Sequence, residues 1–420
     1  MIGTKARPQD PLRLQILLTL GFALLVFWHL ATPAKLFFDE IHYIPAARAM
    51  LQGLPANPEH PLFAKSLMAL SIRLLGDTPM AWRLPSAVMG CMGLLAFGRC
   101  LWWITGRPVA ALAGMVLLAS DFAWFVQSRI AMLDMVMAGF AMLALALWSG
   151  AAMDSTAHPA RRILWLALGG VGFGLALGAK WSALPLWALA AFALLALRLL
   201  RPDKLNRLGW GPVLFYTIAL PLIAYWLTFW PAFHHAHDAI SPWDPLGWHR
   251  TMLDLQEGVI KHHPYQSVWS QWIINWRAIW YLYEFTEGAQ RGVVLLGNPF
   301  SMLAGLVALV WCSWVAYAQR RVDAALVLAA YLASLGLWVV AAKPVQFYYH
   351  YLLPGTCLMA ALALAVDGLW QAGQRWRREA AGIVLLSIGV MVWFYPILSA
   401  APLSHGARSF EQWMWLDSWR

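Results

Sequence analysis

The feature that most constrains this chain is its succession of long apolar segments. About eleven runs, each close to the roughly 20 residues that a helix needs to cross a bilayer core, follow one another through the sequence. Backbone polar groups in such runs must pair within the segment, so each run is expected to be a helix. We therefore predict an all-α polytopic membrane protein with about 11 transmembrane helices, at about 12–32, 84–104, 108–126, 130–149, 162–179, 181–200, 211–230, 292–316, 323–342, 351–370 and 382–401.

The composition excludes other classes of protein. Apolar residues make up 61% of the 420 residues, and charged residues only 12%, against about 25% in an ordinary soluble domain. This excludes a soluble globular protein and a disordered one. The net charge of +10 does not indicate nucleic-acid binding, because the basic residues stand in short clusters between apolar runs. The four cysteines lie inside those runs without a CxxC motif, so we predict no redox or zinc role for them.

The distribution of basic residues predicts the topology. About half of the thirty lysines and arginines fall at every second junction between apolar runs, as the positive-inside rule expects of cytoplasmic loops. The N-terminus is then cytoplasmic, and an odd number of crossings leaves the C-terminus outside. The first run is long enough to span and has no small-residue cleavage site, so we expect it to remain as a signal anchor.

Two long loops, at about 33–83 and 231–291, fall on the outer side in this topology. Pro45 and Gly53 bound one helical pattern in the first loop, and Pro61 begins a second with an apolar face. In the later loop, Trp248 and Met252 share a helical face. We expect these amphipathic helices to lie along the membrane surface. No soluble domain is visible, so residues 1–420 are treated as a single membrane domain.

Ionisable residues near the outer ends of the apolar runs are the candidates for chemistry. Asp39 and Glu40, in FFDEIHY, follow the first run; adjacent carboxylates point in different directions, so one could act as a base while the other holds structure. Taken alone, each candidate also has a structural interpretation, such as a helix cap, a snorkelling lysine or an Arg129–Asp134 ion pair. The remaining candidates are His60, Lys65, Arg83, Arg129, Asp134, Lys180, His262, His263, Gln266, Lys343, His350 and Tyr351.

The predicted topology brings these scattered residues to one face of the membrane. Carboxylates and several cations at one membrane surface suit a lipid-linked phosphate, because cations stabilise the leaving phosphate and a carboxylate accepts a proton from an attacking hydroxyl. The sequence has no P-loop and no GxGxxG motif, which argues against a nucleotide donor. HHAHD, at 234–238, has the spacing of a zinc cluster but no clear fourth ligand, so we expect a surface loop and assign no metal, although the sequence leaves a divalent metal open.

The order of the motifs resembles that of a known family. FFDEIHY, HPLFAK, RLPSA, QSRIAMLD, LGAKW, HPYQS, LLGNP and FYYHYLLP follow one another between about residues 35 and 365. Each motif is weak alone, but the series is similar to protein O-mannosyltransferases, membrane glycosyltransferases of the GT-C class. HPLFAK has one proline fewer than the family's motif. The second long loop has no room for the soluble lumenal module of eukaryotic members, which favours a bacterial-type enzyme.

The resemblance implies a GT-C fold and an activity. It assigns catalysis to Asp39 and Glu40, and it matches Arg83 and the Lys180–Trp181 pair to the family's arginine and lysine-tryptophan motifs. It implies an inverting transferase in the bacterial inner membrane, with a periplasmic active site, that moves mannose or a related sugar from a polyprenyl-phosphate donor to a Ser/Thr hydroxyl of an exported protein. A lipid A or other envelope glycolipid acceptor is the alternative. A secondary transporter is a third reading, which the position of the ionisable residues at one face disfavours.

Overall fold

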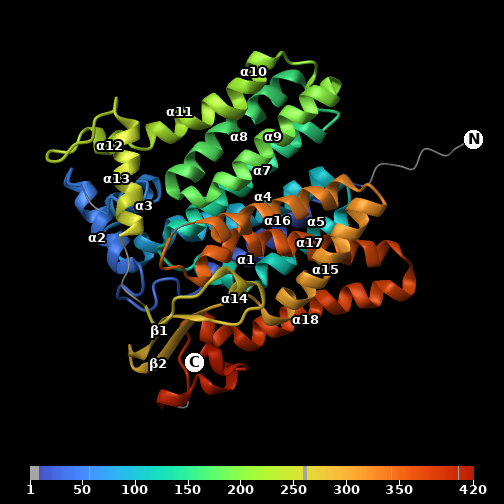
Figure 1. Ribbon diagram of the computed structural model, residues 1–420. Helices are drawn as coiled ribbons and strands as arrows, with labels where there is room; N and C mark the ends of the chain where they lie inside the picture. Colours follow the sequence, from blue (N-terminus) through green and yellow to red (C-terminus); the bar gives the residue numbers. More distant parts are fainter. Residues whose placement is uncertain (1–8, 56, 259–262, 342, 405) are drawn as a thin grey trace, which may run out of the picture.

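The computed structural model describes residues 9–55, 57–258, 263–341, 343–404 and 406–420, and it shows a helical bundle with one small hairpin (Figure 1). The helices of the first half are α1 Leu12–Phe27, α2 Glu40–Leu51, α3 Phe63–Leu75, α4 Pro79–Thr105, α5 Pro108–Ala119, α6 Phe122–Gln127, α7 Leu133–Met153, α8 Pro159–Ala179 and α9 Leu184–Leu200. Those of the second half are α10 Trp210–Leu214, α11 Leu220–Leu227, α12 Trp230–Phe233, α13 Pro245–Glu257, α14 Trp269–Ile273, α15 Pro299–Ala318, α16 Val322–Val340, α17 Leu352–Gln371 and α18 Gln374–Leu398, and the strands are β1 Ile279–Thr286 and β2 Ala289–Leu295.

The chain is a multi-pass membrane protein. Among the described residues, nine helical segments are long and apolar enough to cross a membrane. Two further apolar helices, α1 and α5, fall at the other two predicted spans but are shorter. The predicted helical membrane fold is therefore confirmed, while the number of crossings stays a prediction.

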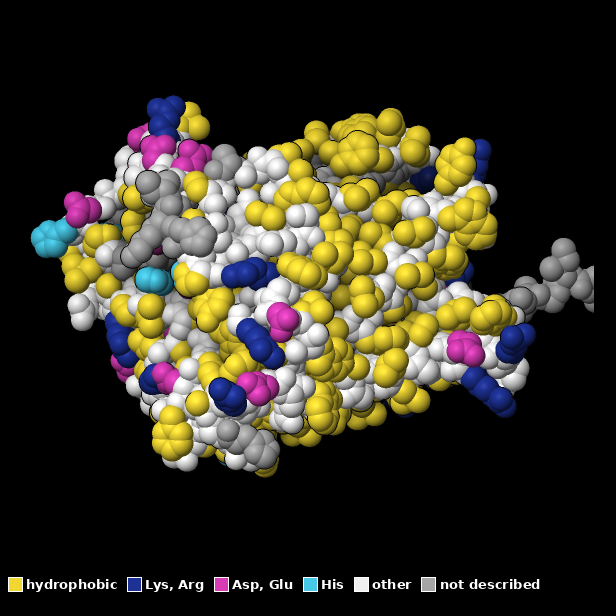
Figure 2. Space-filling model, turned by 60° about the horizontal axis from the view of Figure 1, so that its bottom comes forward, with side chains coloured by type: hydrophobic (Ala, Val, Ile, Leu, Met, Phe, Trp, Pro, Cys, Tyr) yellow, Lys and Arg dark blue, Asp and Glu magenta, His cyan; other side chains and the backbone are white. Residues whose placement is uncertain are grey.

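The surface of the molecule fits this assignment. Figure 2 shows a broad region of apolar side chains without charged groups, and Lys, Arg, Asp and Glu side chains lie on either side of it. Exposed Leu, Val, Phe and Trp side chains on α1, α9, α15, α16 and α18 contribute to the apolar surface of the bundle. Such an exposed apolar area would aggregate in water, and it is the expected surface of a helix bundle in lipid.

Local sequence signals explain where several of these helices begin. Thr78 accepts a hydrogen bond from the backbone N–H of Ala81 and is followed by Pro79, the first residue of α4. Asn298 does the same for Ser301 at the start of α15, again with a proline at the first helical position. A capping side chain satisfies an otherwise unpaired N–H, and proline at the first position removes one that would have no partner.

The hairpin is the part of the fold that the all-α prediction missed. Residues 292–295 were assigned to a membrane span, but they belong to strand β2, and the helix that follows begins only at Pro299. Glu287 and Gly288 connect the two antiparallel strands, and both have positive φ, as a two-residue type I′ turn requires. A short apolar run does not by itself distinguish a buried strand from a helix, which is why the pattern was read as helical.

The amphipathic helices gather at one end of the bundle. In Figure 1, α2, α3, α12 and α13 lie at the left with the hairpin below them. Trp248 and Met252 of α13 are buried against Leu62 and Phe229, so the predicted apolar face of this helix packs on the rest of the protein. Of the predicted site residues, these elements and the loops between them carry Glu40, His60, Lys65, His263 and Gln266.

Helices α4 and α7 pack closely through a glycine. A Cβ atom added to Gly139 of α7 would stand 2.6 Å from the carbonyl oxygen of Met89 on α4. Small residues of this kind let helix backbones approach within membranes, where packing replaces the hydrophobic effect. The close contact fixes α4, which carries Arg83, against α7, which carries Asp134.

Candidate active site

The two adjacent carboxylates have different surroundings. Glu40 is fully buried and accepts hydrogen bonds from Arg83 Nε at 2.8 Å and Nη2 at 3.1 Å. It also accepts from the backbone N–H groups of Phe37, at 3.3 Å, and Ala131, at 3.0 Å. A buried carboxylate with this number of donors is fixed in place and has no free oxygen for chemistry.

Arg83 extends the same network along the first loop. Its Nη1 donates to the carbonyl oxygen of Leu30 and its Nη2 to that of Lys35, each at 3.0 Å. The guanidinium also lies 4.9 Å from the ring centroid of Phe37. Arg83 therefore ties the segment that precedes Asp39 to helix α4, and the ion pair with Glu40 positions that segment.

Asp39, by contrast, is only partly buried and faces ionisable groups. Its charged neighbours are Lys180, His42, Asp134 and Lys343. Burial raises the pKa of the Asp39 carboxyl to about 6, and Lys180 opposes that rise. A carboxylate with a pKa near 6 is mostly ionised at pH 7 yet remains basic enough to accept a proton from a hydroxyl.

Lys180 and Asp134 form a buried ion pair beside Asp39. Lys180 Nζ lies 2.8 Å from both carboxylate oxygens of Asp134. It also lies 4.7 Å from the ring centroid of Tyr349. The pair joins the turn between α8 and α9 to the first turn of α7, and Tyr349 brings the FYYHYLLP segment to the same place.

His60 has Lys180, Lys343 and Lys65 as ionisable neighbours. Lys65 Nζ is fully buried and donates to Asn57 and to the carbonyl oxygen of His60, so it holds the 57–60 loop in place. Burial lowers the pKa of Lys65 to about 7. Burial lowers the pKa of His60 well below its usual value, and the charges of Lys180, Lys343 and Lys65 lower it further. His60 is therefore neutral at pH 7.

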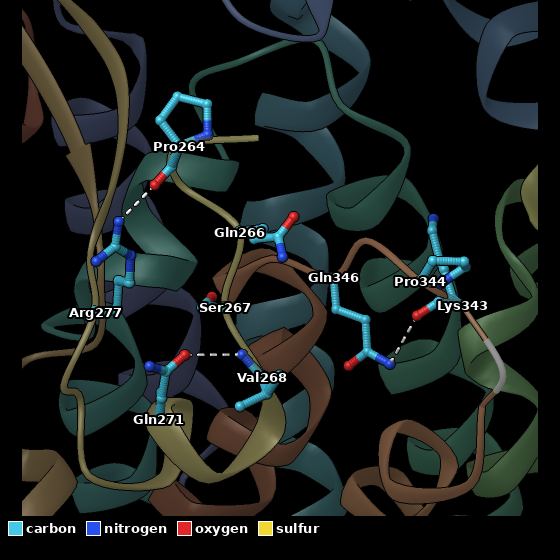
Figure 3. A pocket seen from close by; sticks show the side chains of 9 residues that line it. All are labelled: Pro264, Gln266, Ser267, Val268, Gln271, Arg277, Lys343, Pro344 and Gln346. Carbon is cyan, nitrogen blue, oxygen red and sulfur yellow. Dashed lines mark hydrogen bonds between the residues drawn. The ribbon is translucent and has the colours of Figure 1, made fainter. Parts of the chain in front are cut away.

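A polar cavity of about 420 Å³ opens next to Lys343 (Figure 3). Lys343 and Arg277 lie on opposite sides of it, and the side chains of Gln266 and Gln346 lie between them. None of the described residues that line it carries a carboxylate, which makes the cavity suitable for an anion. Burial lowers the pKa of Lys343 to about 8, so it carries a positive charge at pH 7.

The HPYQS motif forms one wall of this cavity. Gln266 Oε1 accepts a hydrogen bond from the backbone N–H of His263. The ring of His263 lies edge-on to that of Phe347, with centroids 5.1 Å apart. These contacts attach the later loop to the FYYHYLLP segment. The predicted site residue His262 lies outside the described residues.

Two other predicted site residues lie away from Asp39 and Lys180. Arg129 donates to the carbonyl oxygens of Leu25, Val26, Trp28, His29 and Ser399, so it caps the C-terminal end of α1. The expected Arg129–Asp134 ion pair is wrong, because Asp134 pairs with Lys180 instead. The Tyr351 hydroxyl is buried and hydrogen-bonded to the hydroxyl of Tyr331, at 2.8 Å.

Some residues around the site were missed from the sequence. Arg277 and Gln346 line the cavity, and Tyr281 stacks on Phe38, next to Asp39, with ring centroids 4.0 Å apart. The positive-inside rule places most basic clusters in the cytoplasmic loops, whereas Arg277 lies in a long loop predicted to be outside. A basic residue at such a position was the signal that could have identified Arg277. Tyr281 gave no signal, because its strand was read as a loop.

The HHAHD segment contributes no metal cluster in the part of the chain that the structure describes. No group of three or more His, Cys, Asp or Glu side chains among those residues is arranged to hold a metal ion. His234 Nδ1 pairs with the carbonyl oxygen of Trp230. The segment lies on the loop between α12 and α13, away from Asp39 in the sequence.

Two family models match the chain. Residues 76–237 match "Dolichyl-phosphate-mannose-protein mannosyltransferase", and residues 246–419 match "C-terminal four TMM region of protein-O-mannosyltransferase". The chain is 26% identical over 453 residues to a polyprenol-phosphate-mannose–protein mannosyltransferase of Mycolicibacterium smegmatis strain MKD8, covering 91% of this chain and 87% of the relative. A protein of the same name from Corynebacterium glutamicum is 27% identical over 469 residues, covering 91% and 88%.

Solved structures share the fold. The protein O-mannosyltransferase Pmt1–Pmt2 complex of S. cerevisiae, bound to the sugar donor, superposes with a TM-score of 0.83 at 14% identity, covering 99% of this chain and 93% of the other. ArnT from Cupriavidus metallidurans, bound to undecaprenyl phosphate, gives a TM-score of 0.58 at 18% identity, covering 94% and 68%. Together, the two family models account for most of the sequence, and the chain belongs to the protein O-mannosyltransferase family of GT-C membrane glycosyltransferases.

Proposed function

We propose that this protein transfers a mannosyl residue from a polyprenyl-phosphate donor to a Ser or Thr hydroxyl of an exported protein. The observation that carries the proposal is a partly buried carboxylate, Asp39, with Lys180 and Lys343 as charged neighbours, while Lys343 also lines an anion-compatible cavity. The names of the bacterial relatives supply the donor and the class of acceptor. They favour a protein acceptor over an envelope glycolipid.

In this proposal, Asp39 is the general base. It takes the proton from the acceptor hydroxyl as that oxygen attacks the anomeric carbon, and the bond from that carbon to the phosphate oxygen breaks. Lys343 and Arg277 bind the phosphate and stabilise the charge that it gains on leaving. A single displacement of this kind inverts the anomeric centre, in contrast to hydrolases in which two carboxylates flank the bond.

The other site residues position these groups. Glu40 and Arg83 hold the backbone before Asp39, and Asp134 holds Lys180 beside it. Lys65 holds the loop that contains His60. We also propose that residues 1–420 act as one glycosyltransferase domain.

We also propose a location and an orientation. Basic residues cluster at alternate helix junctions, which favours an N-terminus in the cytoplasm and a C-terminus and active site in the periplasm of a bacterial inner membrane. An active site on that side meets exported proteins as they emerge. The lipid donor reaches it from the outer leaflet.

The test is transfer of radiolabelled mannose from polyprenyl-phosphate mannose to a panel of Ser/Thr peptides by purified protein. Asp39→Asn keeps the shape of the side chain and removes the base, so we expect transfer to fall at least about a hundredfold. Asp203→Asn is the matched control, because Asp203 is exposed in the short 3-10 helix after α9, and the whole of α9 separates it from Lys180 in the chain. Near-normal transfer by Asp39→Asn would refute the assignment, and transfer to glycolipids but not to peptides would refute the protein acceptor.

A further inference from the structure

His350, one of the site residues predicted from the sequence, is a buried imidazole. It lies in the turn that leads into α17 and is only 3% exposed. Its ring stacks on that of Trp338, with centroids 3.8 Å apart, and lies 5.9 Å from that of Trp272. Aromatic packing on two sides fixes the plane of the ring and therefore the direction of both ring nitrogens.

One hydrogen bond determines where the proton of this ring lies. The backbone N–H of Phe347 donates to His350 Nδ1 at 3.1 Å. Because Nδ1 accepts, it carries no proton, and in the neutral ring the proton must be on Nε2. Nε2 is thus a hydrogen-bond donor whose direction is fixed by the backbone and by the stacked ring.

That donor has no acceptor within the described ranges of the chain. Nε2 is buried, and none of the described residues forms a hydrogen bond with it. A buried donor without a partner destabilises a protein, so such groups are uncommon and call for an explanation. A ligand oxygen that enters the site would provide the missing acceptor.

The surroundings of His350 indicate which ligand that is. Lys180, Lys343 and His60 are its titratable neighbours. The lysines attract an anion, and Lys343 lines the cavity assigned above to the donor phosphate.

We propose that His350 binds the lipid-linked donor through a hydrogen bond from its Nε2–H to an oxygen of the phosphate. This inference rests on the proposed function, since it takes the donor to be a polyprenyl-phosphate sugar. The phosphate is preferred to a sugar hydroxyl because two of the three titratable neighbours are lysines. His350 is then a donor-binding residue that acts alongside Lys343, with a directional bond in place of a net charge.

Two substitutions separate this role from a structural one. His350→Gln can present an amide N–H at the place of Nε2, but it does not reproduce the ring. His350→Asn places an oxygen near Nδ1, where it accepts from Phe347, but it has no donor near Nε2. His237→Gln is the control, because His237 is exposed on the loop after α12.

The probe is polyprenyl phosphate without sugar, titrated into the purified full-length protein in detergent, with thermal unfolding followed in parallel. We expect His350→Asn to weaken its binding at least about tenfold, as the loss of a hydrogen bond to a charged group predicts. His350→Gln and the control should bind within about threefold of wild type. The same ordering is expected with polyprenyl-phosphate mannose.

Other outcomes would overturn the inference. Equal binding of polyprenyl phosphate by wild type and by His350→Asn would exclude the phosphate contact. Weaker binding of the mannosylated lipid alone would assign the bond to a sugar hydroxyl instead. If His350→Gln were the weaker and less stable variant, the role of the ring would be to cap Phe347. If wild type bound neither lipid, the proposed function itself would fail.

Discussion

The buried Glu40–Arg83 ion pair offers the sharpest test of how the site is held together. Both side chains are completely buried, and the pair is 2.8 Å long. Arg83→Met removes the cation but leaves the Glu40 carboxylate inside the protein. Removing one partner of a buried ion pair typically costs about 3–5 kcal/mol, because the remaining charge has no compensation.

A second substitution should recover much of that loss. Glu40→Gln removes the negative charge but keeps one oxygen. That oxygen can accept from the backbone N–H of Phe37 or from that of Ala131, which bond to different oxygens of the Glu40 carboxylate. The double variant, Arg83→Met with Glu40→Gln, should therefore be more stable than Arg83→Met alone, by about 2 kcal/mol or more. This gain, measured in a double-mutant cycle, is the cost of the unpaired charge.

Thermal unfolding of the purified protein in one detergent measures these differences. For a chain of 420 residues, a loss of this size corresponds to a fall in Tm of about 3–6 °C for Arg83→Met. Arg48→Met is the matched control, because Arg48 pairs with Asp77 at the surface, where such pairs contribute about 1 kcal/mol or less. The reasoning fails if Arg83→Met melts within about 2 °C of wild type, or if the double variant is no more stable than the single one.

Two further predictions concern pH and packing. The rate of mannosyl transfer should rise as pH increases through about 6, where Asp39 ionises, and should fall above about 8, where Lys343 loses its charge. Lys343→Arg should move only the alkaline limb of the rate profile to higher pH. A flat profile would argue against both assignments. Gly139→Ala should lower the free energy of unfolding by about 1–3 kcal/mol, because the added Cβ would meet the carbonyl oxygen of Met89. Gly389→Ala on α18 is the control, because the space around its Cβ is open, and it should leave the stability unchanged. Equal Tm values for the two alanine variants would contradict this.

Several features of the fold follow from short stretches of the sequence. Apolar run length predicted the membrane helices, because a bilayer demands both the length and the internal pairing of backbone groups. Pro79 and Pro299, each after a capping residue, mark helix starts that a reader of the sequence can find. The hairpin was missed because β1 falls in the segment interpreted as a loop, and because the short apolar run at 292–295 in β2 does not by its periodicity distinguish a strand from a helix.

The residue types of the site were also visible in the sequence, but their pairing was not. Asp39 and Glu40 are neighbours in the chain with the same chemistry, and only the fold buries Glu40 against Arg83 while leaving Asp39 facing Lys180. Asp134 likewise pairs with Lys180 rather than with the nearby Arg129. The sequence alone determined that the chain crosses a membrane and carries these ionisable groups, because those properties depend on length and composition. The tertiary structure decided which carboxylate pairs with Arg83 and which faces Lys180, because an ion pair depends on distance in space between helices that are far apart in the chain.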